Sequence, residues 1–325
     1  MSERATEGDA RACRLCGEPR LRTFSAELLE CPRCGALASI EQPQDPQAHY
    51  SKNFYTGEEA ERFRFGLEWP VRFFRWMRFR RLMRWGPYRR VLDIGTDRGW
   101  FLKCFQNAGA EVFGTQLSEP AARVASRRLG REIFLGELSG ARFPAASMDL
   151  VCLYHVLEHV REPLEYLREI TRVLRPGGLL AIEVPNARCL TARWFGRHWL
   201  GWDLPNHVHH FDPASLRALL ERHGFTVLAG SHGSVEFGPF HILQTVLNAL
   251  GFSRNQLYHL LQREELHAGP RASAASQITM LALAVMLAVP CGLLSLLLSL
   301  CGQGEVFRFY CRKRGEPSLG GPGRT

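Results

Sequence analysis

The sequence has almost no lysine and no apolar run near its start. Its net charge of +9 comes almost entirely from arginine, which favours anionic partners such as nucleic acid, anionic lipid headgroups or a phosphorylated substrate. Residues 1–10 are charged and lack an apolar core, so we expect no secretory signal there. Six of the ten cysteines are scattered, which argues against a disulfide framework and indicates a reducing compartment.

The other four cysteines form two C-x-x-C-G units, Cys13 with Cys16 and Cys31 with Cys34. Each glycine permits the tight turn that points backbone amides at sulfur, and four thiolates at this separation can surround one zinc ion tetrahedrally. Because four protein ligands leave no position for water, the expected zinc is structural. We therefore expect a zinc ribbon over residues 1–48. Zinc ribbons also bind nucleic acid, which keeps that class of function open.

Residues 49–89 interleave aromatic side chains with arginines. At helical spacing one face would be aromatic and the other basic, as in a helix that lies on an anionic membrane surface. A lead-in helix that packs its aromatic face on the main domain and leaves its arginines in solvent has the same pattern, so both interpretations stay open. Base stacking combined with phosphate contact is a third use.

The stretch from Arg90 to Leu102 has the pattern of a buried strand, a turn that contains Gly95 and Gly99, and a helix that begins near Arg98. Such a turn lets a nucleotide-type ligand approach the backbone closely. The pattern then predicts strands at 111–115, 132–135, 148–154, 178–184 and 225–228, and helices at 120–129, 162–174 and 216–223. This alternation predicts an α/β fold over 90–231, with a doubly wound parallel sheet and a ligand at the carboxyl ends of its strands.

The glycine turn resembles motif I of class I S-adenosylmethionine-dependent methyltransferases, which is written D-x-G-x-G-x-G. Asp93, Gly95 and Gly99 match this motif, and Asp97 stands in the place of the middle glycine. Two later segments, LYHVLEHV at 153–160 and VLRPGG at 173–178, resemble those of ubiquinone-biosynthesis methyltransferases. The resemblance implies a seven-stranded Rossmann-like methyltransferase sheet that binds S-adenosylmethionine.

The resemblance also implies roles for particular residues. Gln116 stands where the family places an acidic residue on the ribose of the cofactor, and Glu137 stands where an acidic residue meets the adenine amino group. Tyr154 and His155 would border the methionine part of the cofactor. Glu158 and His159 are metal-ligand types, but no third ligand follows at suitable spacing, so we expect them to serve in capping and packing.

A loop at 194–211, which follows the fifth strand, is rich in aromatics and histidines and contains the run WDLPNHVHHF at 202–211. It resembles the W-x-D-x-P-x-H-x-x-x-F stretch of small-molecule methyltransferases that also carry a zinc ribbon, some of which act on sugars or isoprenoid-linked compounds. Methyl transfer needs in-line positioning and, for a hydroxyl or carbon acceptor, removal of a proton. His207 is the predicted catalytic base and His210 the second candidate. Packing of the loop by His207, His209 and His210 is the alternative.

Residues 278–301 contain no charge and are long enough to cross a bilayer. They lie in an insertion at 232–304, and a period-two pattern at 305–314 predicts a seventh, antiparallel strand beside the sixth. A spanning helix would place this strand across the membrane from its sheet and would oppose the positive-inside tendency. Because Pro290 and Gly292 interrupt the segment, we expect a helical hairpin in the cytoplasmic leaflet. A true span and a buried hairpin are the alternatives, and 315–325 are expected to form a disordered tail.

Together these patterns predict a membrane-associated methyltransferase on the cytoplasmic face of the membrane. Its acceptor would be a small molecule, either lipid-linked or of the sugar or quinone type. One alternative is a zinc-ribbon nucleic-acid-binding protein or RNA methyltransferase, although the sequence lacks the N-P-P-Y or D-P-P-Y run of base amino methylation. The other is a catalytically inert membrane-associated scaffold, because Asp97 and Gln116 depart from the family pattern.

Overall fold

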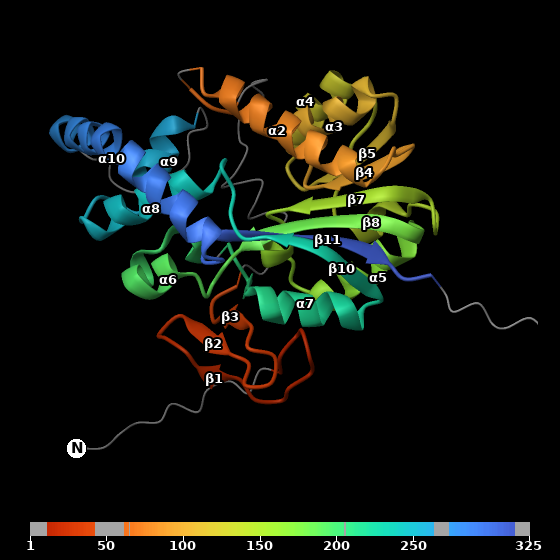
Figure 1. Cartoon of the computed structure of the whole chain (residues 1–325), viewed down its shortest axis with the longest axis horizontal. Coiled ribbons are helices and arrows are strands. Elements are labelled where there is room, and N and C mark those ends of the chain that lie inside the picture. Colours follow the sequence, from red (N-terminus) through yellow and green to blue (C-terminus); the bar gives the residue numbers. More distant parts are fainter. Residues whose placement is uncertain (1–11, 43–61, 65, 205, 263–272, 316–325) are drawn as a thin grey trace, which may run out of the picture.

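The computed structural model describes residues 12–42, 62–64, 66–204, 206–262 and 273–315 (Figure 1). The expected boundary of the zinc ribbon at residue 48 lies outside these residues. So do the first part of the lead-in segment, up to residue 61, and all but the first residue of the expected tail at 315–325.

A seven-stranded sheet forms the centre of the molecule, in the order β10-β11-β8-β7-β4-β5-β6. Its strands are β4 (Arg90–Ile94), β5 (Glu111–Gln116), β6 (Phe134–Leu135), β7 (Met148–Tyr154), β8 (Leu174–Pro185), β10 (Phe225–Ser231) and β11 (Val306–Lys313). The strands from β8 to β6 are paired in parallel, whereas β11 pairs antiparallel with both β8 and β10. The doubly wound sheet and its antiparallel last strand are therefore as predicted. The order reverses between β4 and β7, and such switch points are where α/β sheets bind ligands.

Helices cover both faces of this sheet (Figure 1). On one face, α5 (Pro163–Val173) and α7 (Pro213–Arg222) pack on Val151 and Leu153 of β7. On the other face, α3 (Trp100–Asn107) and α4 (Glu119–Leu129) lie in the core that contains Leu150 and Cys152 of the same strand. Alternate side chains of β7 thus belong to two separate cores, because successive side chains of a strand point to opposite faces.

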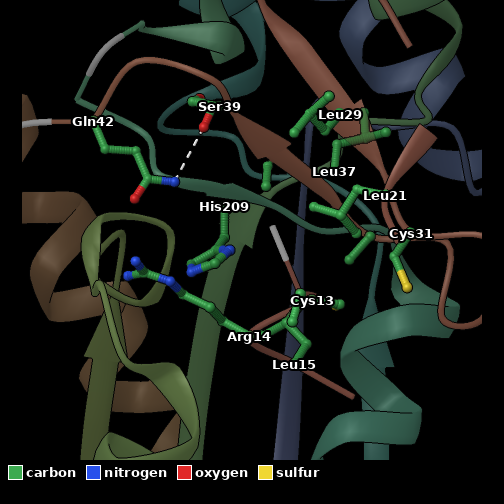
Figure 2. A pocket seen from close by; sticks show the side chains of 13 residues that line it. Cys13, Arg14, Leu15, Leu21, Leu29, Cys31, Leu37, Ser39, Gln42 and His209 are labelled. Carbon is green, nitrogen blue, oxygen red and sulfur yellow. Dashed lines mark hydrogen bonds between the residues drawn. The ribbon is translucent and has the colours of Figure 1, made fainter. Parts of the chain in front are cut away.

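The four cysteines lie in a second, smaller sheet. Its strands are β1 (Arg22–Thr23), β2 (Leu28–Glu30), β3 (Leu37–Ser39) and β9 (His209–His210), in that order. Strand β9 comes from the histidine loop and pairs antiparallel with β3, so that Leu37 lies opposite His210. Figure 2 shows a pocket lined by residues of this N-terminal sheet and its loops, with His209 of β9 on its wall. The N-terminal sheet is therefore completed by the loop that carries the predicted base.

The described part of the insertion contains the helices α8 (Gly238–Ala249), α9 (Gln256–Leu261) and α10 (Ala274–Leu300). The expected hairpin is wrong, because α10 runs without a break through Pro290. A proline inside a helix removes one hydrogen bond, here to the carbonyl of Met286, and its ring crowds that carbonyl. Pro290 and Met286 both lie on the exposed side of the helix, where solvent or lipid can accommodate the local distortion.

One face of α10 packs on the protein and the other does not. Met280, Ala284, Cys291 and Leu298 are buried in a cluster with α8 and α9. The opposite face carries apolar side chains that are largely exposed, among them Val285 (78 %), Val289 (70 %), Leu293 (64 %) and Leu300 (78 %). By length and composition, α10 is the one helix among the described residues that could cross a membrane.

Helix α2 (Glu68–Leu82) turns most of its aromatic side chains outward. Trp69, Phe73 and Trp76 stack on one another at its surface, with ring centroids 6.3 and 5.8 Å apart, and Trp69 is 73 % exposed. Arg75 and Arg78 point inward instead, toward carboxylates of the core. The interpretation in which α2 packs its aromatic face inward and leaves its arginines in solvent is therefore wrong for Arg75, Arg78 and the three stacked rings, because acidic groups of the core hold these arginines. It holds for Phe79, which packs on Phe105 of the core with ring centroids 5.0 Å apart.

Arg308→Ala tests how strongly the buried charges stabilise the fold. Arg308 of β11 pairs with the fully buried carboxylate of Glu183, and its removal leaves that charge short of a partner inside the protein. We expect the free energy of unfolding to fall by about 3–5 kcal/mol, as for other broken buried ion pairs. Arg312→Ala, at an exposed position of the same strand, is the control and should change it by less than about 0.5 kcal/mol. Urea denaturation measures both; equal, small losses would contradict the expectation.

Candidate active site

The glycine turn follows β4 at the carboxyl edge of the sheet. Gly95 has a φ of 72°, and a Cβ atom there would lie 2.6 Å from Cγ2 of Val156, so only glycine fits. Asp97 has a φ of 51°, which is the left-handed region that aspartate tolerates better than most residues. Replacement of the middle glycine of the motif by Asp97 therefore keeps the path of the turn.

Asp93, the first residue of the motif, is buried within β4. Burial raises the pKa of its carboxyl from 3.8 to about 7, against the opposing effects of Arg75, Thr96 and Arg78. A buried carboxyl with such a pKa exists in both protonation states near neutral pH. The charge at the end of this strand is therefore sensitive to what binds beside it.

A pocket opens where the strands β4, β5, β6 and β7 end. Among its lining residues are Gly95, Gln116, Glu137 and His155, four of the seven residues predicted to bind the cofactor. Asp93, Gly99 and Tyr154 are not among them; the ring of Tyr154 lies under the guanidinium of Arg78, 4.4 Å from its centroid. His159, which the sequence did not place in the cofactor site, also lines the pocket.

Gln116 at the end of β5 has a defined orientation. Its Oε1 accepts hydrogen bonds from the backbone N–H groups of Leu117 and Ser118, at 2.8 and 3.3 Å. This leaves the side-chain NH₂ as the group to offer to a ligand, so Gln116 can donate to a hydroxyl oxygen. Glu137, across the pocket, is exposed and can accept.

His155 forms part of the pocket wall with an unusual backbone, at a φ of 53°. Its Nε2 lies 3.2 Å from Glu183 Oε1 and its Nδ1 lies 3.4 Å from Glu158 Oε1. Burial alone would lower the pKa of His155, but these two carboxylates raise it to about 9. The ring is therefore an imidazolium at neutral pH and gives the pocket a fixed positive charge.

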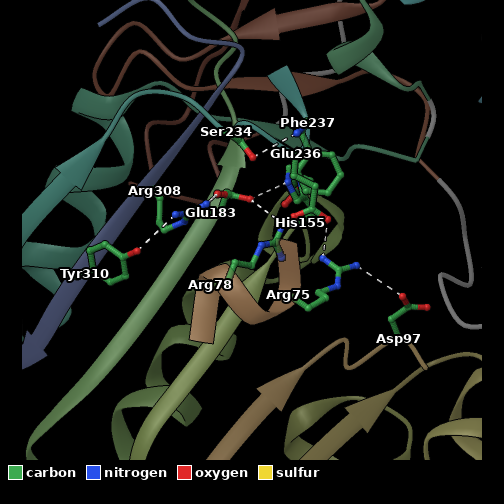
Figure 3. Close-up of polar contacts among 11 residues, drawn as sticks. Arg75, Arg78, Asp97, His155, Glu183, Ser234, Glu236, Phe237, Arg308 and Tyr310 are labelled. Atoms are coloured by element: carbon green, nitrogen blue, oxygen red, sulfur yellow. Dashed lines mark hydrogen bonds and ion pairs between the residues drawn. The ribbon is translucent and has the colours of Figure 1, made fainter. Parts of the chain in front are cut away.

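Figure 3 shows that His155 belongs to a longer chain of charges. Arg78 contacts Glu183 at 3.4 Å and Glu236 at 2.6 Å, and Arg75 contacts Glu236 at 3.0 Å. Arg75 also reaches Asp97 of the glycine turn at 3.7 Å. The sequence analysis missed this chain. Glu183 and Arg308 each interrupt an otherwise apolar run, LLAIEVP at 179–185 and VFRFYC at 306–311, and that signal could have revealed them.

The three histidines of the loop have different surroundings. His207 donates from Nδ1 to the carbonyl of Gly201 at 2.8 Å. His209 Nε2 lies 3.4 Å from the carbonyl of Arg161, and His210 Nε2 lies 3.0 Å from Ser39 Oγ in the N-terminal sheet. Burial holds the pKa of His210 well below its ordinary value. The role of either His207 or His210 as a base stays a prediction, and neither residue is among those that line the pocket.

The residues that the structure describes contain two groups of metal-ligand side chains. In the N-terminal sheet, Cys13 and Cys34 have Sγ atoms 3.7 Å apart, and those of Cys16 and Cys31 are 3.4 Å apart. Thiolates around one zinc lie roughly 3.8 Å from each other, given Zn–S bonds of about 2.3 Å, so the four sulfurs suit a single ion.

The second group consists of Glu158, His159 and His207, whose ligand atoms all lie within 4.8 Å of one another. The fold therefore brings His207 beside Glu158 and His159 as a third side chain of a metal-ligand type, while the capping and packing roles expected of these two residues stay a prediction. The expected absence of a third ligand rested on sequence spacing, whereas the fold returns His207 to the other two from the loop after β8.

The sheet order, the glycine turn at its switch point and the pocket beside it define an α/β domain of the Rossmann-like methyltransferase type. Residues 60–229, just over half of the chain, match the family described as methyltransferase domain, and the chain belongs to that family. The family match covers β4 to β8 and most of β10, and therefore the whole pocket.

Individual relatives match a smaller part of the chain. A Mycolicibacterium smegmatis protein named "Probable S-adenosylmethionine-dependent methyltransferase" is 31% identical over 143 residues, 43% of this chain and 52% of the relative. A ubiquinone biosynthesis O-methyltransferase of a Ruegeria species is 32% identical over 146 residues, 42% of this chain and 59% of the relative. The chain thus spans about half the length of these relatives.

Solved structures resemble this chain at lower identity. A SAM-dependent methyltransferase from Archaeoglobus fulgidus is 19% identical, with a TM-score of 0.45, over 74% of this chain and 94% of that chain. Phosphoethanolamine N-methyltransferase 2 of Haemonchus contortus, in complex with S-adenosyl-L-methionine, is 16% identical, with a TM-score of 0.48, over 74% of this chain and 52% of that chain.

Asp93→Asn tests the buried carboxyl through pH. The pKa of Asp93 rises from 3.8 to about 7 on folding, so the stability it contributes is complete below about pH 4 and is lost as the pH rises through 7. Asparagine does not ionise, so the variant does not lose this stability as the pH rises. We expect the variant to be more stable than the wild type at pH 8, by up to about 4 kcal/mol, and to differ little at pH 4. Urea denaturation at both pH values measures this, and parallel pH profiles of variant and wild type would contradict it.

Proposed function

We propose that the protein transfers a methyl group from S-adenosylmethionine to a small acceptor. The observation that carries this proposal is the pocket, where Gly95, Gln116, Glu137 and His155 converge from four strand ends. When bound, S-adenosylmethionine supplies an electrophilic methyl group on a sulfonium. In the proposal the side-chain NH₂ of Gln116 donates to a ribose hydroxyl and Glu137 accepts from the adenine amino group. The imidazolium of His155 pairs with the carboxylate of the methionine part.

The proposed acceptor is lipid-linked or of the quinone or sugar type. Support comes from the Ruegeria relative named for ubiquinone biosynthesis and from the exposed apolar face of α10, which includes Val285 and Val289. A hydroxyl acceptor must lose a proton, and His207 is the group that we predict to handle it. His207 lies beside His159, with ring centroids 4.6 Å apart, and His159 lines the pocket.

We further propose a structural zinc on Cys13, Cys16, Cys31 and Cys34. The sulfur separations support it, as does the closed arrangement of four donors. In this proposal the ion stabilises the N-terminal sheet, which in turn pairs through β3 with the histidine loop. The zinc thus acts on the active site through the backbone and takes no part in the chemistry.

A membrane location on the cytoplasmic face completes the proposal. The segment before α2 is joined to α9, because Arg62 donates to the hydroxyl of Tyr258 at 2.7 Å and Phe63 bridges Gln262. The segment that leads into α2 is therefore connected to the insertion that contains α10. Because α10 leads directly into β11, which pairs with β10 and β8 in the sheet, we propose that it lies along one leaflet.

The nucleic-acid alternative loses support, since two of the arginines that suggested it, Arg75 and Arg78, pair with acidic groups of the protein.

Glu137→Ala tests the cofactor site. The proposed hydrogen bond between Glu137 and the adenine is charge-assisted, so its loss should weaken S-adenosylmethionine binding about 10- to 100-fold. Glu132→Ala, which removes a similarly exposed carboxylate before β6, should leave the affinity unchanged. Calorimetric titration of both variants and the wild type measures the effect. If the wild type binds neither S-adenosylmethionine nor its demethylated product, the proposed activity is wrong and the inert scaffold gains support.

The double variant Val285→Glu, Val289→Glu tests the membrane location. Both residues lie on the exposed apolar face of α10. Burial of two carboxylates in the apolar part of a membrane would oppose insertion of this helix. The wild type should float with vesicles that contain anionic lipid, and the variant should stay in the soluble fraction. Leu135→Glu, an exposed apolar position on the edge strand β6, is the control and should float like the wild type. Flotation of the double variant would contradict the proposal.

A further inference from the structure

The outward face of α2 carries a line of aromatic rings that continues into arginines. Trp69, Phe73 and Trp76 follow one another at helical spacing, Arg80 extends the line within the helix, and Arg84 extends it directly after the helix. Positions three and four apart are neighbours on a helix surface, so these five residues form one outer stripe, and all of them are exposed. We infer that the outer stripe docks on an anionic lipid bilayer. The inference rests on the proposed membrane location and names a second surface for it.

Contacts on the inner side of α2 fix the direction in which the outer stripe faces. Phe79 packs edge to face on Phe105 of α3, with ring centroids 5.0 Å apart, and Leu82 is fully buried. Arg78 is buried as well and pairs with Glu183 of β8. A rotation of the helix that brought the outer rings onto the core would break all of these contacts. The stripe therefore faces away from the protein.

The three rings of the outer stripe contact one another and leave much of their surface open. Trp69 stacks on Phe73 with an angle of 8° between the ring planes, and Phe73 stacks on Trp76 with an angle of 28°. Phe73 is 45 % exposed and Trp76 is 47 % exposed. A contiguous exposed apolar patch on a folded protein marks a surface that binds a partner.

The charge of the same surface selects an anionic partner. Arg80 lies over the ring of Trp76, 5.7 Å from its centroid, and among the residues that the structure describes no carboxylate lies within ion-pair distance of Arg80, Arg81 or Arg84. The acidic residue of α2, Glu68, is buried. The positive charge at this end of the helix is thus not balanced by the protein. Such a cluster is attracted to the negative surface of an anionic bilayer.

A bilayer fits the outer stripe better than a nucleic acid does. Aromatic rings of this kind insert at the level of the lipid headgroups, and long arginine side chains beside them reach the phosphates. A bilayer would also cover the exposed apolar face of α10, which a nucleic acid would leave in water. Three rings and two arginines alone give weak and reversible binding, so stable attachment still needs α10.

Quenching of tryptophan fluorescence by lipids with brominated acyl chains tests the position of the rings. The full-length wild type is mixed with brominated vesicles that contain phosphatidylglycerol, and its emission should be quenched. In the double variant Trp69→Phe, Trp76→Phe most of this quenching should be lost, because the two indoles that enter the bilayer are gone. Phenylalanine keeps the stripe apolar, so cosedimentation of this variant with the same vesicles should persist and is the control for binding.

Arg80→Gln, Arg84→Gln tests the role of charge. Each arginine near an anionic surface contributes about a factor of five, so the affinity for vesicles with phosphatidylglycerol should fall about 20- to 30-fold. Arg33→Gln, Arg168→Gln changes the net charge equally and is the matched control, which should keep the wild-type affinity. Arg33 is exposed in the N-terminal sheet, and Arg168 is exposed on α5, across the central sheet from α2 (Figure 1).

The possible outcomes separate this inference from the proposals on which it rests. Equal quenching of the wild type and of the tryptophan variant would overturn the docking of α2 and leave attachment through α10 standing. A wild type that binds no vesicles would overturn both. Absence of lipid quenching together with salt-dependent RNA binding, or with a dimer that the tryptophan variant lacks, would assign the stripe to that other partner and overturn the inference. Methyl transfer is not measured, so the proposed activity is judged separately.

Discussion

The buried carboxylate of Glu183 is the constraint on which the arrangement of this protein depends. It lies near the end of β8 with no exposure to solvent, and three cationic groups from three elements surround it. Arg308 comes from β11, Arg78 from α2 and His155 from the segment after β7. A charge buried this deeply is tolerated only with close partners, so each of these elements must reach the same point. The last strand, the lead-in helix and the pocket wall are thereby held together.

The same constraint gives α2 its unusual orientation. Arg75 and Arg78 must face the core to meet Glu236 and Glu183, and Arg72 lies over the ring of Trp100, 3.7 Å from its centroid. The helix then has no room on that side for most of its aromatics, and they stack at the surface. Part of the basic composition of this segment therefore serves contacts within the protein. Outside, the helix presents the stacked rings of Trp69, Phe73 and Trp76.

Local signals predicted much of this structure, and long-range contacts explain most of what they missed. The bounds of β7 at Met148–Tyr154 follow from its apolar run, and Gly95 follows from the need for a positive φ. Which face of α2 packs inward depends on acidic residues far away in the sequence. The position of His207 beside His159 depends on how the loop after β8 folds back onto the sheet. Pro290 shows a different limit: it marks a helix break only where the lost hydrogen bond cannot be tolerated.

Hydrogen bonds join the N-terminal sheet to the loop that contains His207, His209 and His210. Ser39 at the end of β3 donates to the carbonyl of His207 at 2.6 Å and contacts His210 Nε2 at 3.0 Å. The pairing of β3 with β9 begins only two residues after His207. The position of the His207 ring is therefore set in part by the N-terminal sheet, which contains the four cysteines. Order in this sheet is thus a condition for the geometry of the histidine loop, although the two segments lie far apart in the sequence.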